Sequence, residues 1–159
     1  MGKGRNVASD SSTEKIINNR KRVRNHGEVF TPSHIVKRML SLKSIKEACE
    51  SLTATFLEPG AGEGAFLVEV LKRKLRMVER CFGDSLERYE NYSLLALSTL
   101  YGIELLEDNT KVCVMKLSRA FYDAYLSKTF PNHGQMRSST RSIDLHRKKS
   151  ALSRVLYDQ

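Results

Sequence analysis

Apolar residues in the stretch TPSHIVKRML recur at the spacing of an amphipathic helix, with Ile35, Val36, Met39 and Leu40 on one face. Thr31 would cap this helix, and Pro32 suits its first turn because the missing N–H is not needed there. The segment SIKEACESL continues in helical spacing. The pattern changes at TATFLE, which is short, β-branched and aromatic and ends in a turn signal, so it predicts a buried strand.

Helical spacing returns after a run of glycines. In GAFLVEVLKRKLRMVERCF one face is apolar and the other basic, so we expect Leu67, Leu71, Leu75 and Val78 to be buried and Lys72, Arg73, Lys74 and Arg76 to face water. Another helix with Asp84 or Ser85 at its cap, a short strand in LYGIELL and a long helix over 107–126 follow. This order of elements is the opening of an α/β fold with a parallel sheet.

The charge of the chain is unevenly distributed and divides it into three parts. Residues 1–26 and 128–159 each carry seven Lys/Arg and two acids, whereas residues 27–127 carry thirteen basic and fourteen acidic residues. Residues 1–26 form a basic segment that we expect to be flexible, and residues 127–159 form a second one that we expect to be disordered. Such flanks could contact DNA phosphates or could simply be solvated tails, and charge alone favours the tails.

Length and composition narrow the class of protein. The 159 residues fit one modest domain, with 40% hydrophobic and 28% charged residues. No apolar run approaches the roughly 20 residues of a membrane span, and the N-terminus lacks the apolar core of a secretion signal. The three cysteines have no close partner in sequence, so we expect reduced thiols and a cytoplasmic protein. The four histidines have no spacing typical of a metal site, and we predict none.

The stretch FLEPGAGEGAFL, residues 56–67, carries the candidate chemistry. A strand that ends in glycines and feeds a helix offers backbone N–H groups and lets another molecule approach closely. GAGEGA satisfies the dinucleotide fingerprint G-x-G-x-x-A, but Glu58 at the strand tip would repel a pyrophosphate and suits an ammonium group. Glu104, at the end of the next strand, could accept hydrogen bonds from ribose hydroxyls. An amino acid joined to a ribose describes S-adenosylmethionine.

Three motifs together extend this interpretation. GEVFTP followed by a helix, FLEPGAGEGAFL and YGIELLEDN resemble motifs X, I and II of the bacterial adenine-specific DNA methyltransferases of restriction–modification systems. The resemblance covers residues 27–126, the front part of a full family member. It implies a partial Rossmann-like methyltransferase fold with S-adenosyl-L-methionine as cofactor, DNA as partner and a bacterial cytoplasm as location.

The resemblance also implies roles for individual residues. Phe30, Thr31 and Pro32 would line the methionine side of the pocket, with the Thr31 hydroxyl near the carboxylate. Glu58 would face the amino group, where the family more often has Asp, and Glu104 would hold the ribose. The remaining cofactor residues would be Pro59, Gly60, Ala61 and Gly62 beneath the cofactor, Phe66 behind the turn and Leu105 against the adenine.

The catalytic motif of that family, Asn/Asp-Pro-Pro-aromatic, is missing, because no two of the three prolines are adjacent. We therefore predict no catalytic residues and expect a truncated or partial methyltransferase that is inactive alone and is completed by a further segment or a complementing chain. The alternative is a non-catalytic interaction protein that docks on a methyltransferase or on DNA through its basic flanks. A nicotinamide-dependent oxidoreductase and a methyltransferase acting on RNA or protein are weaker alternatives.

Overall fold

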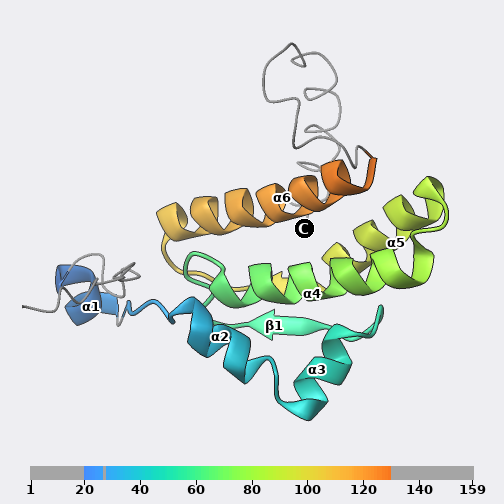
Figure 1. Ribbon diagram of the computed structural model, residues 1–159. Helices are drawn as coiled ribbons and strands as arrows, with labels where there is room; N and C mark the ends of the chain where they lie inside the picture. Colours follow the sequence, from blue (N-terminus) through green and yellow to red (C-terminus); the bar gives the residue numbers. More distant parts are fainter. Residues whose placement is uncertain (1–19, 27, 130–159) are drawn as a thin grey trace, which may run out of the picture.

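The computed structural model describes residues 20–26 and 28–129 (Figure 1). The described residues form six helices and two strands in the order α1 (Arg20–His26), α2 (Ser33–Met39), α3 (Lys43–Cys49), β1 (Phe56–Glu58), α4 (Ala65–Phe82), α5 (Leu86–Ser98), β2 (Leu100–Gly102) and α6 (Glu107–Thr129). The predicted order of helices and strands over residues 31–126 is therefore confirmed.

The two strands pair in parallel, as an α/β fold requires. Phe56 lies opposite Leu100 and Glu58 lies opposite Gly102, and the connection between the strands runs through α4 and α5. Because the strands are parallel, their carboxyl ends lie side by side. The Ile103 N–H donates to the Glu58 carbonyl at 2.9 Å, and the Ala61 N–H donates to the Ile103 carbonyl at 3.0 Å. These bonds fix the glycine turn against the end of β2.

Strand β1 is shorter than TATFLE predicts. The Ser51 hydroxyl accepts hydrogen bonds from the N–H groups of Thr53 and Ala54, which closes a local turn where the strand was expected to begin. The Lys74 ammonium donates to the carbonyls of Ser51 at 2.7 Å and Ala54 at 2.9 Å. Residues 51–54 are therefore held by side chains and not by a sheet ladder.

Helix α4 forms the centre of the core. Leu67, Leu71, Leu75 and Val78 are buried as predicted, and α4 packs against α5 and α6 on one side and against α2 and the strands on the other. The prediction for Lys74 is wrong: this residue is 0% exposed and lies over the Phe56 ring. Its aliphatic stem follows the apolar face while its ammonium reaches the two carbonyls of the preceding turn. Burial lowers the pKa of Lys74.

Two helix starts test the predicted caps. The Ser85 side chain accepts a hydrogen bond from the Arg88 N–H and caps α5, so of the two predicted candidates, Asp84 and Ser85, the second is the cap. Thr31 does not cap α2, because Pro32 occupies the cap position and no side chain bonds the first turn. The Pro32 carbonyl instead accepts from Ile35 and Val36. The Thr31 hydroxyl is therefore not used by the helix that follows it.

The flanks fall partly outside the described residues. Residues 20–26, expected to be flexible, form α1, and the Arg22 side chain of this helix bonds residues at the start of α6. Residues 127–129 continue α6, although the disordered segment was expected to begin at 127. The predictions for residues 1–19 and 130–159 concern positions that the structure does not describe.

One face of the sheet is covered and the other is open. Phe56 and Leu100 pack into the core, whereas Leu57, Tyr101 and Ile103 are 63%, 45% and 59% exposed. The register places Leu57 opposite Tyr101, so these side chains project from the same face. The described part of the chain thus leaves an apolar sheet face uncovered. None of its helices is long and apolar enough to cross a membrane.

Candidate ligand-binding site

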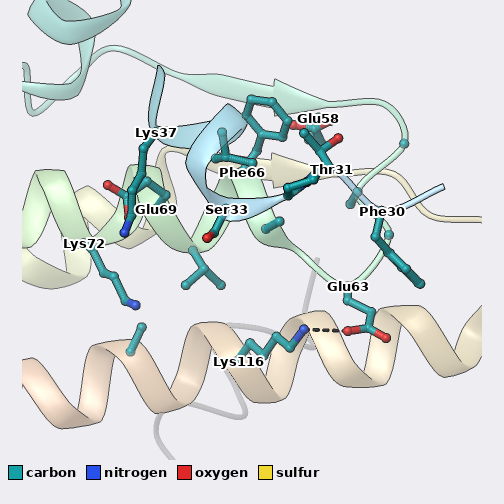
Figure 2. Close-up of a pocket in the computed structure, with 18 of the residues that line it drawn as sticks. Phe30, Thr31, Ser33, Lys37, Glu58, Glu63, Phe66, Glu69, Lys72 and Lys116 are labelled. Atoms are coloured by element: carbon teal, nitrogen blue, oxygen red, sulfur yellow. Dashed lines mark hydrogen bonds and ion pairs between the residues drawn. The ribbon is translucent and has the colours of Figure 1, made fainter. Parts of the chain in front are cut away.

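A cavity of about 840 Å³ opens at the carboxyl end of β1 (Figure 2). The segment before α2, the helix α2 itself, the glycine turn and residues of α4 and α6 surround it. Eight of the eleven residues predicted to bind a cofactor line it: Phe30, Thr31, Pro32, Glu58, Gly60, Ala61, Gly62 and Phe66. These eight residues come from two separate stretches of the sequence, 30–32 and 58–66, which meet at one site.

Only some of the glycines in the turn are required by the backbone conformation. Gly62 and Gly64 have φ of 53° and 80°, a region that side-chain-bearing residues rarely adopt. A Cβ on Gly64 would also lie 2.5 Å from the Cys113 sulfur. Around Gly60 a Cβ would meet nothing within 4 Å, so the fold does not need glycine there. The space above Gly60 is part of the cavity, where a ligand can approach the backbone.

The Phe30 ring forms the wall opposite the turn. Its Cε1 atom lies 3.7 Å from the position that a Gly62 Cβ would occupy, which is ordinary van der Waals contact. Thr31 and Pro32 follow it and bring the chain across the mouth of the cavity to α2 (Figure 2). The segment before α2 and the glycine turn therefore lie close together across the cavity.

The Glu58 carboxylate lies at the tip of β1 and lines the cavity. It is half-buried, and no hydrogen bond or ion pair joins it to another described side chain. Burial raises the pKa of the Glu58 carboxyl, because the charged form loses hydration without gaining a partner. A cation in the cavity would supply the missing partner and reverse this shift.

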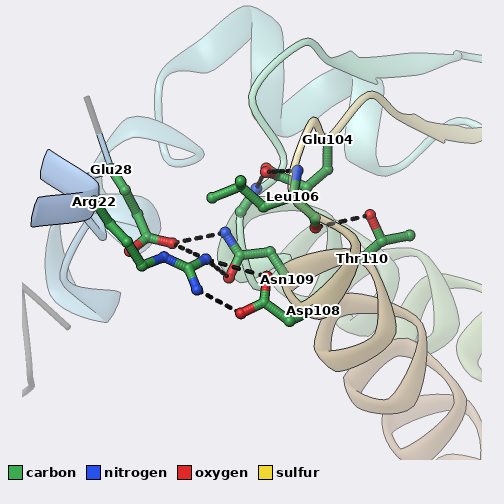
Figure 3. Close-up of polar contacts among 8 residues, drawn as sticks. Arg22, Glu28, Glu104, Leu106, Asp108, Asn109 and Thr110 are labelled. Carbon is green, nitrogen blue, oxygen red and sulfur yellow. Dashed lines mark hydrogen bonds and ion pairs between the residues drawn. The ribbon is translucent and has the colours of Figure 1, made fainter. Parts of the chain in front are cut away.

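Unlike Glu58, the Glu104 carboxylate has hydrogen-bond partners for both of its oxygens (Figure 3). One oxygen accepts from the Gly62 N–H at 2.7 Å and the other accepts from the Leu106 N–H at 2.9 Å. Glu104 does not line the cavity, although it holds a residue that does. Among the other predicted residues, Pro59 is exposed outside the lining and Leu105 is 84% exposed. The structure does not bring these three side chains into the cavity.

Charged residues that the sequence analysis did not assign to the site also line the cavity. Lys116 pairs with Glu63 at 2.6 Å and Arg119 with Asp123 at 3.0 Å. The side chains of Lys37, Glu69 and Lys72 also line this part. The spacing of Ala65, Val68, Glu69 and Lys72 on one helix face could have indicated the wall from α4. Nothing local in the sequence indicates that α6 lies beside it.

The described residues contain no group of three or more His, Cys, Asp or Glu side chains that could hold a metal ion. Cys49 and Cys113 are buried and Cys81 is exposed, all three as free thiols. Comparisons with protein-family models, with curated proteins and with solved structures found no match to this chain. The chemistry of the site therefore rests on its own residues.

Proposed function

We propose that this chain is the cofactor-binding part of a bacterial adenine-specific DNA methyltransferase and that it binds S-adenosylmethionine in the cavity at the end of β1. The observation that supports this most directly is the Glu58 carboxylate, half-buried and without a partner, beside a glycine turn whose Gly60 leaves space for a ligand. A half-buried carboxylate in that position favours a ligand with a positive charge.

The residues of the cavity fit the parts of this cofactor. Glu58 would accept hydrogen bonds from the methionine ammonium, and the Thr31 hydroxyl, which does not cap α2, would donate to the methionine carboxylate. The backbone at Gly60 and Gly62 would lie against the body of the cofactor, and Phe30 would cover it from the other side. When bound, S-adenosylmethionine supplies the methyl group that such enzymes transfer to the adenine amino group.

Glu104 would act mainly by fixing the turn. Its two oxygens each accept one backbone N–H, which leaves further lone pairs that could accept ribose hydroxyls. The role predicted for Glu104 at the ribose therefore remains a proposal, and its role in shaping the turn comes in addition. Leu105, exposed in the segment between β2 and α6, would contact the adenine only if further structure closed over it.

The chain would need a complementing segment or chain for methyl transfer. An Asn/Asp-Pro-Pro-aromatic motif would have to come from that partner, since this sequence has no adjacent prolines. The open face at Leu57, Tyr101 and Ile103 and the unpaired edges of a two-stranded sheet offer a place for further strands and helices. The basic flanks would then contribute contacts to DNA phosphates.

Titration calorimetry with S-adenosylmethionine tests the proposal. We expect weak binding by the isolated chain, because its sheet is incomplete. Glu58→Gln should weaken binding roughly tenfold or more, since a hydrogen bond to a charged group contributes about 1.5–3 kcal/mol. Glu79→Gln removes the same charge from an exposed position outside the cavity and serves as the control. Equal affinities for wild type and Glu58→Gln would contradict the proposed site.

A non-catalytic interaction protein is the second candidate, and the open sheet face favours it. Such a protein would dock on a methyltransferase through Leu57, Tyr101 and Ile103 and on DNA through its basic flanks. A gel-shift assay with and without residues 1–19 and 130–159 tests the contribution of the flanks. DNA retention that is unchanged after their removal would count against it.

A further inference from the structure

Four side chains, from α1, the segment before α2 and the start of α6, form a polar network (Figure 3). The Arg22 guanidinium of α1 donates to Glu28 Oε1 at 2.6 Å and to Asn109 Oδ1 at 3.2 Å, and it pairs with the Asp108 carboxylate. Asn109 Nδ2 donates to the same Glu28 oxygen at 2.8 Å. We call these residues, Arg22, Glu28, Asp108 and Asn109, the Arg22 network.

The network has a buried half and an exposed half. Glu28 and Asn109 are buried, at 8% and 4% exposure, whereas the Asp108 side chain is exposed. The hydrogen bonds that Arg22 donates to Asp108 and Glu28 raise the pKa of Arg22, and the same bond to Asp108 lowers the pKa of that carboxyl. A buried carboxylate such as Glu28 stays in place only while its charge is compensated. Arg22 therefore holds Glu28 inside.

Glu28 lies two residues before Phe30, so its position sets the course of the cavity wall. Residues 28–31 make no backbone hydrogen bond with other described residues before the Pro32 carbonyl starts α2. The Phe30 ring must nevertheless stay in contact with the turn at Gly62. The side chain of Glu28 is thus the principal polar tie between this wall and α6.

The glycine turn, which faces this wall, is also held by residues near the start of α6. Glu104, Leu106 and Asn109 lie within six residues at the start of α6. Glu104 fixes the Gly62 N–H, while Asn109 fixes Glu28. The first turn of α6 and the residues before it therefore hold both the glycine turn and the wall that faces it.

We infer that Arg22, Glu28 and Asn109 are positioning residues that hold Phe30 and Thr31 against the glycine turn, and that α1 is consequently part of the ligand-binding site. The effect on S-adenosylmethionine rests on the proposed function, whereas the effect on the wall does not. Glu28 Oε2 and Arg22 Nε are buried without a hydrogen-bond partner among the described residues.

The first test measures backbone order parameters of residues 29–31 by NMR relaxation in the ligand-free full chain. We expect rigid values near 0.85 in the wild type and values below about 0.6 in Arg22→Gln. Arg24→Gln removes the same charge from an exposed position on α1 and should leave the order parameters unchanged. Asp108→Asn changes only an exposed member of the network and should give an intermediate result without unfolding the protein.

The second test repeats the calorimetry on the same variants. Arg22→Gln should weaken S-adenosylmethionine binding about five- to tenfold, because the loss of conformational entropy on ordering the wall would then reduce the binding free energy. Arg22→Lys should recover part of this loss. Unchanged order parameters in Arg22→Gln would overturn the inference whatever the cofactor result. Looser residues 29–31 with unchanged affinity would also overturn the positioning role. A wild type that binds no S-adenosylmethionine would overturn the proposed function alone, and the NMR result would still decide whether the network holds the wall.

Discussion

Glu58, the last residue of β1, and Glu104, two residues beyond the end of β2, carry the same chemical group in different surroundings. Both are expected from the sequence to bind the cofactor, and both side chains are half-exposed. The two oxygens of Glu104 accept hydrogen bonds from the N–H groups of Gly62 and Leu106, whereas the Glu58 carboxylate faces the cavity without a partner among the described side chains. A carboxylate with satisfied oxygens stabilises the fold, and one without partners is available to a ligand.

Removal of the Glu104 carboxylate should produce the largest change. Glu104→Ala leaves two backbone N–H groups of the turn without an acceptor, and we expect a loss of about 3 kcal/mol in the free energy of unfolding. Urea denaturation followed by circular dichroism measures this loss. Glu107→Ala, at an exposed position on α6, is the control and should change stability by less than about 0.5 kcal/mol. If Glu104→Ala lowered the free energy of unfolding by as little as the control does, the Glu104 carboxylate would not be needed to hold the glycine turn.

A pH series should produce the next largest change, on the Glu58 side of the comparison. In the ligand-free protein, burial raises the pKa of the Glu58 carboxyl above that of an exposed glutamate. A bound ammonium group would favour the ionised form. Binding of S-adenosylmethionine should therefore release a proton, and the affinity should rise with pH up to the raised pKa of Glu58. Below that pKa the affinity should fall by up to about tenfold per pH unit. Calorimetry in buffers of different ionisation enthalpy measures the released proton, and Glu58→Gln should abolish it.

The glycine turn offers a paired test of smaller size. Gly62→Ala should lower stability by about 1 kcal/mol, because alanine is strained at a φ of 53°. Gly60→Ala should leave stability unchanged, because a Cβ there meets nothing within 4 Å, yet it should weaken ligand binding by projecting into the cavity. Thermal unfolding and calorimetry on both variants separate the two effects. Stability losses of equal size would contradict the distinction between a structural and a ligand-facing glycine.

The smallest expected effect has the opposite sign to the first. Glu58→Gln should raise the stability of the ligand-free protein by a few tenths of a kcal/mol at neutral pH, because it removes a charge that burial disfavours. Since the folded-state pKa of Glu58 is raised, the wild type loses stability relative to the variant as the pH rises from the ordinary glutamate pKa through the raised one. Urea titrations of the two proteins over that range measure the difference.

The parts of this structure that sequence predicts well depend on neighbouring residues. The buried face of α4 and the glycines at 62 and 64 follow from helical spacing and from the backbone angles of a tight turn. Ser85 caps α5 because the acceptor and its N–H partner are three residues apart. In these cases the conformation that neighbouring residues prefer locally is the conformation found in the fold.

The parts that sequence does not predict depend on contacts between distant residues. The neighbours of Lys74 in sequence predict a solvent-facing lysine, but its ammonium donates to carbonyls 23 and 20 residues earlier in the chain. Helix α1 was expected to be flexible, because the pairing of Arg22 with Asp108, 86 residues away, cannot be inferred from either segment alone. The α6 wall of the cavity was missed for the same reason.

The tie made by Lys74 closes a ring. Its ammonium joins the carbonyls of residues 51 and 54 to the middle of α4, so the backbone from 54 to 74 forms a loop whose ends are joined by hydrogen bonds. The glycine turn lies within this loop, between a strand and a helix that cannot slide past each other while the fastening holds. A ligand that enters the cavity thus meets a surface whose shape was set beforehand, and little motional freedom is lost there on binding.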